Sequence, residues 1–199
     1  MQNAWFYRIP VLVLLGILGA PPAQATVMIY LNNKELTERA SVVARGMVVR
    51  KQVVEIEGHL WTDSHVRVIE SLKGGLAKGH VLRLRQPGGE TRTLGEHVAG
   101  VARFTVGEEV LVFARRVASH HVPVGMCLGK FRIVRPSSGA PRAERDLSTV
   151  AFGMFDLSGK FQASAGSKAD SRVLSQLLAT IKSHLKQPRL LLKIEGGAR

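Results

Sequence analysis

Apolar and polar residues alternate with a period of two through much of residues 41–135, the pattern of β-strands that bury one face. Glycine and proline interrupt the alternation where turns are expected. Short strands with glycine at their turns and bends favour a mainly β fold, a small five-stranded barrel that is closed or partly closed. The five strands are predicted within residues 41–57, 59–75, 79–87, 108–117 and 120–135.

Two of these segments carry more specific signals. The continuous apolar run at 110–114 is typical of a strand covered on both faces, so residues 108–117 are predicted to be central. In the last segment, Cys127 and Phe131 share one face, with Gly129 between them. A glycine at this position predicts a strand that bends sharply around a barrel corner.

A short helix is predicted before the strands, and a longer one near the C-terminus. Asn32 followed by Glu35 fits a capping box, which opens a helix ending near Ala40. Residues 170–187 repeat apolar positions at helical spacing, and Pro188 forces the end of that helix. Its apolar stripe is expected to dock on the barrel. The alternative is that its lysines hold it on an anionic membrane surface.

The chain divides into one folded unit and its appendages. The barrel is expected over residues 26–135, and the Pro-, Ser-, Gly- and Arg-rich segment that follows is predicted to be a linker with a weak extended patch, residues 136–169. Ser171 or Asp170 is expected to cap the C-terminal helix. Residues 188–199 are predicted to be a loosely held tail.

The first 25 residues are predicted to be a secretory signal peptide. Arg8 supplies a positive flank, residues 11–20 an apolar core, and residues 23–25 a small-residue cleavage pattern. The apolar core of about ten residues falls short of the roughly 20 that cross a bilayer, so no transmembrane span is expected after processing. We therefore expect an exported protein, periplasmic or extracellular, that begins at Thr26.

Removing 25 of the 199 residues leaves 174, the size of a single domain. The sequence has 28 Lys+Arg against 15 Asp+Glu, a net charge of +13, which falls to +12 with the loss of Arg8. This charge favours polyanionic surroundings, although it could also serve solubility alone. One cysteine excludes an internal disulfide, so the core must hold without a covalent cross-link.

No catalytic, cofactor or metal site is predicted. Gly74 and Gly79 have the spacing of a phosphate-binding loop, but the Lys and Ser/Thr that should follow are absent. No G-x-S-x-G elbow and no HExxH motif occurs in the sequence. Cys127 lies near His120 and His121, but its apolar face favours a buried structural thiol over a nucleophile.

A long polar loop, residues 86–104, separates the third and fourth strands. Compact domains rarely keep a loop of this length unless it binds something, covers something or is disordered. Its apolar residues Leu94, Val98 and Val101 are expected to plug an open end of the barrel, which would leave its polar residues free to bind. The candidate binding residues are Gly88, Gly89, Glu90, Arg92, Glu96, His97 and Arg103.

Several segments resemble a bacterial secreted domain of uncharacterised function, which is found alone or beside matrixin-type metalloproteases. The resemblance covers residues 30–135 and rests on ASVVARGMVV, VIESLKG, VLRLRQPGGE, FTVGEEVLVF and GKFRIVR. The strand order is more distantly similar to the OB-fold barrels of netrin-like and tissue-inhibitor-of-metalloproteinase domains. In those inhibitors an N-terminal cysteine ligates the protease zinc, whereas this chain would begin with Thr26 and Val27. A metalloprotease partner is thus implied by the resemblance alone.

Three functions remain open. The first is a non-enzymatic, exported binding module of OB-like fold, whose partner is a protein or an envelope polymer. The second is an electrostatic binder of nucleic acid, lipopolysaccharide or anionic lipid, with few aromatic residues for base stacking. The third and weakest is an unrecognised enzyme that uses His97 or Cys127. The candidate basic stripe for the second function is Arg83, Arg85, Arg115 and Arg116.

Overall fold

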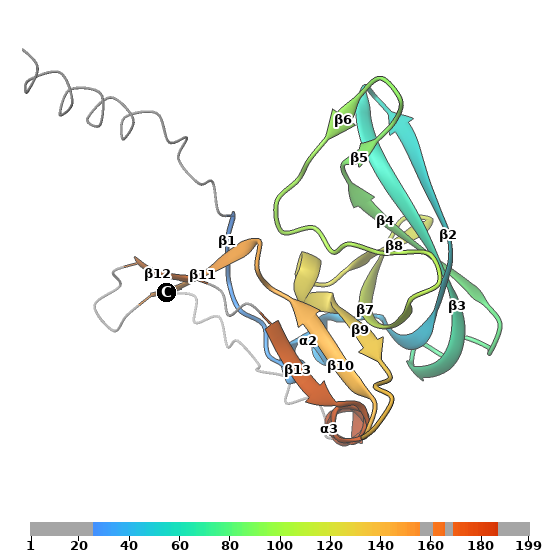
Figure 1. Cartoon of the computed structure of the whole chain (residues 1–199), viewed down its shortest axis with the longest axis vertical. Helices are drawn as coiled ribbons and strands as arrows, with labels where there is room; N and C mark the ends of the chain where they lie inside the picture. The colour runs from blue at the N-terminus through green and yellow to red at the C-terminus, as the bar shows by residue number, and fades with distance from the viewer. Residues whose placement is uncertain (1–25, 156–160, 166–168, 187–199) are drawn as a thin grey trace, which may run out of the picture.

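The computed structural model describes residues 26–155, 161–165 and 169–186, and the protein is mainly β-sheet (Figure 1). Among these residues, eight strands form the largest sheet, in the order β13-β10-β9-β7-β2-β3-β4-β8. In chain order they are β2 (Val42–Ile56), β3 (His59–Lys73), β4 (Val81–Pro87), β7 (Glu109–Val117), β8 (His120–Pro123), β9 (Lys130–Val134), β10 (Arg142–Asp146) and β13 (Ala169–Val173).

Part of this sheet closes into a ring because β7 pairs along both of its edges. One edge of β7 pairs with β2. The other edge pairs with β9 at residues 110–112 and with β8 at residues 114–117. Because β8 also pairs with β4, in parallel at Leu84↔His121, the described strands β7, β2, β3, β4 and β8 form a closed circuit. The predicted mainly β fold and the central place of residues 108–117 are confirmed.

Strand β2 has an irregular register where it pairs with both β3 and β7. Its register against β3 shifts near Val43, Arg45 and Val48, and such irregularities increase local twist. Gly46 lies in this region, where an added Cβ would be 2.5 Å from the carbonyl oxygen of Arg67. Only glycine therefore lets the two strands approach this closely.

The predicted fifth strand, 120–135, is wrong as one continuous element. The 3-10 helix η1 (Met126–Gly129) divides it into β8 and β9. Gly125 and Met126 adopt positive φ angles of 61° and 56°, which turn the chain out of the extended conformation. The bend at Gly129 is real, but it ends a helical turn, and the two strands pair with different parts of β7.

The core fills the ring and continues beneath the helices α2 (Asn33–Arg39) and α3 (Leu174–Lys186). Helix α2 begins at Asn32 with the capping box that the sequence predicts, formed with Glu35, and buries Leu36. Helix α3 packs against α2, β3, β10 and β13. The largest fully buried apolar side chains include Leu36, Leu60, Leu82, Leu84, Leu111, Phe113, Leu128, Phe131 and Ile181.

The predicted linker over residues 136–169 is wrong at residues 142–146, whereas its weak extended patch corresponds to strand β11 (Val150–Phe155). Residues 142–146 form β10, which lies between β9 and β13. The strand was hidden because its sequence, RAERD, carries a buried arginine at an inward position, Arg145, where an apolar residue would be expected. Helix α3 also starts later than predicted, because β13 occupies residues 169–173. Asp170 and Ser171 therefore bind arginines of β10 and do not cap the helix.

A second sheet flanks the main one (Figure 1). Strand β1 (Thr26–Met28) pairs in parallel with β11 (Val150–Phe155), and β11 pairs with β12 (Phe161–Ala165). An edge-to-face contact between Tyr30 and Phe152, with ring centroids 5.3 Å apart, joins this sheet to the chain leading into α2. The predicted signal peptide, 1–25, and the predicted tail, 188–199, lie outside the described residues. No helix of the described part is long and apolar enough to cross a membrane.

Candidate binding site

The candidate binding loop is held against β3 at one end of the ring. Two short strands inside it, β5 (Gly89–Glu90) and β6 (Gly95–Glu96), form a hairpin. The backbone N–H of Leu60 donates to Glu96 Oε2 at 2.8 Å, and the Thr62 hydroxyl donates to the Gly88 carbonyl at 2.7 Å. These contacts fix a segment in which the sequence gives no helical or alternating pattern.

Gly88 and Gly89 make the approach of the loop to the sheet possible. Gly88 has a φ of +87°, in the left-handed region that favours glycine. A Cβ on Gly88 would lie 2.8 Å from the Glu96 carbonyl oxygen, and one on Gly89 would lie 2.8 Å from Val53 Cγ1. The two glycines therefore allow the hairpin to fold back onto β2 and β3.

The loop closes the ring with different residues from those predicted. Leu94 is 49% exposed, and Val98 and Val101 are only half-buried. Ala102 and Phe104 instead enter the core. In the orientation that satisfies both of its polar atoms, the Gln86 amide donates to the carbonyl and accepts from the N–H of Ala102, each at 3.1 Å. Gln86 thus links the end of the loop to β4.

Between the loop and the sheet lies an open cavity of about 600 Å³, which we call the ring-mouth pocket. Strands β2, β3 and β4 and the loop all contribute to its lining. Arg92, alone among the seven candidate loop residues, does not line it. Those that do are Gly88, Gly89, Glu90, Glu96, His97 and Arg103, joined by Lys51, Thr62, Ser64, Gln86, Pro87, Gly95, Val98, Val101, Ala102, Phe104 and Thr105.

Ser64 is the most unusual residue in this lining. It is 1% exposed, and its hydroxyl has no hydrogen-bond partner among the described residues. A buried polar group without a partner costs about 1–3 kcal/mol, so such groups are uncommon. The sequence contained a signal for it, because the inward positions of β3 run Leu60, Thr62, Ser64, Val66 and Val68, with two hydroxyls toward the ring mouth.

Some charged side chains at the rim of the pocket have a hydrogen-bond or ion-pair partner, and others have none among the described residues. The exposed side chains of Lys51, Glu90 and Arg103 form no hydrogen bond or ion pair with the described residues. Glu96 is engaged, because it accepts from Leu60 and lies 3.6 Å from Nδ1 of His59. The lining therefore carries two cations and two carboxylates, and one of the carboxylates, Glu96, is held toward Leu60 and His59.

The four arginines of the candidate basic stripe are not equivalent. Arg85 donates twice to the buried carboxylate of Asp63, with both bonds 2.7 Å long. Burial raises the pKa of Asp63, but the hydrogen bonds and charge of Arg85 outweigh it and leave that pKa below its usual value. Arg83 donates to Ser119, while Arg115 and Arg116 are exposed on β7. Arg85 is thus largely neutralised where it lies.

The two candidate catalytic residues line different cavities, His97 the ring-mouth pocket and Cys127 a cavity beside β9 and β10. Cys127 is a free, buried cysteine, and burial raises the pKa of its thiol, which disfavours the nucleophilic thiolate. His97 is exposed and has no hydrogen bond or ion pair with the described residues. Within the described part of the chain, no three His, Cys, Asp or Glu side chains come together as a metal site would require.

A second, smaller cavity of about 370 Å³ lies beside β9 and β10, and no pattern in the sequence predicted it. Lys130 lines this cavity and pairs with Glu108 at 2.8 Å, while Arg132 pairs with Glu144 at 3.2 Å. Most of its charges are therefore already compensated. Arg103 lines both cavities and forms no ion pair with the described residues, but its charge helps the hydrogen bonds from Ser148 to keep the pKa of Asp146 below its usual value.

Comparison with known families and proteins leaves the site to be interpreted from its own geometry. No protein-family model matches the chain, and no curated protein matches it.

Proposed function

We propose that this protein is an exported, non-enzymatic binding module of OB-like fold, whose partner is a protein or a cell-envelope polymer held at the ring-mouth pocket. The observation that carries the proposal is the buried, unpartnered hydroxyl of Ser64 in an open cavity beneath a fixed loop. Folded proteins rarely keep such a group without a use, and binding sites are cavities that combine apolar walls with a few placed polar groups.

Two further observations support this proposal. OB-type barrels bind ligands on one barrel face and its flanking loops, and the ring-mouth pocket has that position in a five-strand ring. The loop is clamped to β3 through Glu96 and Gly88, so little ordering is needed when a ligand binds. The signal peptide expected at residues 1–25 would deliver the module across the inner membrane.

Capture experiments with residues 26–199, which contain every described residue, test the proposal. The protein would be immobilised, exposed to envelope and secreted fractions, and washed at low and at high salt. We expect retention at high salt that the loop variant Arg103→Ala abolishes. Arg92→Ala is the matched control, because this loop residue lies outside the pocket lining. If the loop variant captured the partner at high salt as well as the wild-type protein does, the proposal would be contradicted.

The alternative function, polyanion binding, is favoured by the exposed Arg115 and Arg116 and by the net charge of +13. It predicts capture that is lost at high salt and that depends on these arginines, not on the loop. The same experiment separates the two functions when an Arg115→Ala, Arg116→Ala variant is included. An enzymatic function is the weakest candidate, because burial raises the pKa of Cys127.

A further inference from the structure

We propose that the ring-mouth pocket takes an acidic side chain from an extended segment of a partner protein, whose backbone pairs with the open edge of β2. This inference rests on the proposed binding function and names the chemistry of the ligand. It combines three features of the described residues: the floor of the pocket, its rim, and the strand edge beside it.

The floor of the pocket calls for a hydrogen-bond acceptor. The Ser64 hydroxyl has a proton to donate and no partner within the described residues. Its neighbour on the inward face, Thr62, already donates to the Gly88 carbonyl, and Gln86 is engaged with Ala102. A carboxylate is the strongest acceptor that a protein ligand can bring, because hydrogen bonds to ionised groups are stronger than neutral ones.

The rim of the pocket offers two cations to a carboxylate. Lys51 and Arg103 line it without an ion pair, whereas Glu96 is held by the Leu60 N–H. Glu90 is the second carboxylate of the rim, so its formal charges balance, but Glu96 is held toward Leu60 and His59, and both cations stay without an ion pair among the described residues. A ligand that places one carboxylate between Lys51 and Arg103 would complement this arrangement.

The open edge of β2 favours a polypeptide over other anions. Strand β2 pairs with β7 only from Val42 to Met47, and backbone hydrogen bonds of Val48 with Gly107 and Glu108 end that contact. Beyond Val48, β2 pairs with β3 alone among the described strands, and Figure 1 shows this hairpin extending past the ring. Lys51 lies on that part of β2 and lines the pocket.

An extended chain added to this edge would make main-chain hydrogen bonds and place alternate side chains on the pocket side. A nucleic acid or a polysaccharide cannot make that backbone ladder. Stacking of nucleic-acid bases needs an exposed aromatic ring. Among the described residues that line the pocket, Phe104 is the only Phe, Tyr or Trp, and it is 4% exposed. The observations therefore favour an acidic, extended protein segment.

Binding of synthetic peptides to residues 26–199 tests the inference by fluorescence anisotropy at about 0.15 M salt. The probe is a labelled ten-residue peptide of alternating glutamate and valine, and its twin replaces every glutamate by glutamine. We expect the twin to bind at least about tenfold more weakly. N-methylation of alternate peptide bonds in the acidic peptide removes the N–H groups that would pair with β2, and it should weaken binding by a comparable factor. Equal binding by the acidic peptide and its twin would overturn the proposal.

Variants of the pocket locate the binding. Ser64→Ala, Lys51→Ala and Arg103→Ala should each weaken the acidic peptide by about three- to thirtyfold, while Arg92→Ala and Lys78→Ala stay within about twofold. Ser64→Ala should not lower the urea midpoint, because the hydroxyl it removes has no partner to lose. Arg103 is exposed, so Arg103→Ala tests the site even where a core variant fails to fold.

The outcomes separate this inference from the function on which it rests. Loop-dependent capture at high salt without peptide binding would overturn the acidic-segment proposal and leave the binding module intact. Failure of both experiments would overturn both. Oligogalacturonate and single-stranded DNA serve as competing probes. If either binds as tightly as the peptide, with the same dependence on Ser64 and Arg103, the edge-pairing argument is wrong.

Discussion

Arg145 of β10 shows how one buried charge can organise an otherwise apolar region. Its side chain is 0% exposed, pairs with Asp170 Oδ2 at 2.5 Å and donates to the Tyr30 hydroxyl at 3.0 Å. Its guanidinium carbon lies 4.7 Å from the centroid of the Phe131 ring. A buried arginine of this kind is tolerated only when its donors are satisfied, so these partners explain how β10 can carry an inward charge.

Replacing Arg145 by Met should lower the free energy of unfolding by about 3 kcal/mol, as measured by urea denaturation. The loss falls at the lower end of the range for broken buried pairs, because Asp170 keeps a bond of 2.9 Å to Arg172. Arg132→Met is the matched control, since its partly exposed pair with Glu144 is worth under about 1 kcal/mol. Equal losses in the two variants would contradict this account.

The residues of the candidate site could be predicted only in part from the sequence. Gly88, Gly89 and the charged loop residues stood out because they interrupt the strand pattern. Alternation could have placed Ser64 on the inward face with Val66 and Val68, but it could not show that Ser64 and Lys51 line one pocket, because that depends on the pairing of β2 with β3 and on the fold of the loop. The ion pair between Arg85 and Asp63 could not be predicted from the sequence either, since it depends on the register between β3 and β4.

Strand β8 is the element that closes the ring, and it does so through few contacts. It pairs with β4 at a single position, Leu84↔His121, and with the end of β7. Both of its histidines have a pKa below the usual value. Burial is the main cause for each, followed by the charges of Arg85 and Arg83 for His120 and that of Arg116 for His121.

Acidification should therefore weaken the fold at this closure. As the pH falls through about 6.5, the unfolded chain takes up protons that the folded protein resists at His120 and His121. Stability is thus fully present above this pH and declines until the lowered pKa values are reached. The double variant His120→Gln, His121→Gln should show a smaller decline between pH 7 and pH 5 in urea titrations. His97→Gln is the control; an unchanged decline in the double variant would exclude the mechanism.

The apolar spacing in helix α3 predicts that the helix exists, but it does not predict the residue at which the helix begins. The apolar spacing predicted both the helix and its docking, and Leu174, Leu177 and Ile181 are indeed buried. Its start was wrong because the sequence continues without a break from β13, and β13 in turn depends on pairing with β10, an element that periodicity did not reveal. Local pattern defined the helix, whereas long-range pairing defined where it begins.

Ile181→Ala should cost about 2–5 kcal/mol in the free energy of unfolding, because the side chain is 0% exposed and its removal leaves a cavity between α3 and the sheet. Thr180→Ala, one residue away on the exposed side, should change it by less than about 0.5 kcal/mol. If Ile181→Ala were as mild as its neighbour, and instead reduced binding to anionic vesicles, the membrane-surface interpretation of the helix would be favoured.

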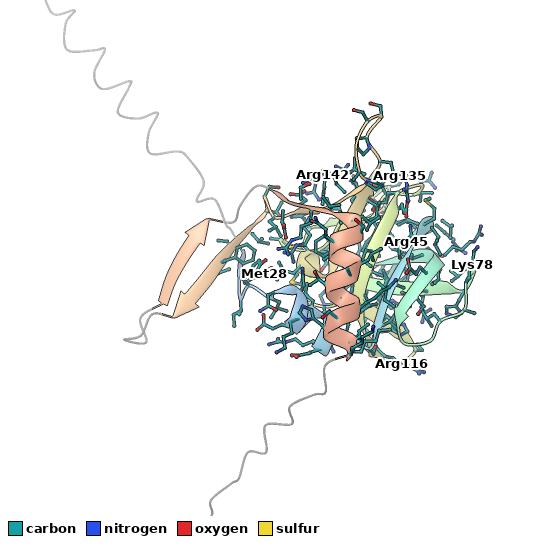
Figure 2. All side chains as sticks on the ribbon, turned by 90° about the horizontal axis from the view of Figure 1, so that it is seen from below. Met28, Arg45, Lys78, Arg116, Arg135 and Arg142 are labelled. Atoms are coloured by element: carbon teal, nitrogen blue, oxygen red, sulfur yellow. The ribbon has the colours of Figure 1, made fainter. Side chains whose placement is uncertain are left out.

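Across the described part of the molecule, single acidic residues form ion pairs with more than one basic residue. Glu109 pairs with both Arg45 and Arg135, and Glu70 pairs with Arg45 and Lys182. Sharing of this kind leaves other cations unpaired. In Figure 2, Lys78, Arg116 and Arg142 lie on different sides of the body, so the positive charge is spread around it.

This distribution predicts how the protein should bind a polyanion. Binding to duplex DNA should be weak and should fall steeply with salt, and replacing Arg83, Arg115 and Arg116 by Ala should reduce the slope of log K against log salt by at most about 2.7. The remote triple variant Lys34→Ala, Lys78→Ala, Arg92→Ala, which removes the same charge, should reduce it equally. Arg85→Ala should leave the slope nearly unchanged, because Asp63 already neutralises that guanidinium. If the stripe variant alone abolished binding, the arginines of β4 and β7 would form a shaped polyanion site, and the second function would replace the first.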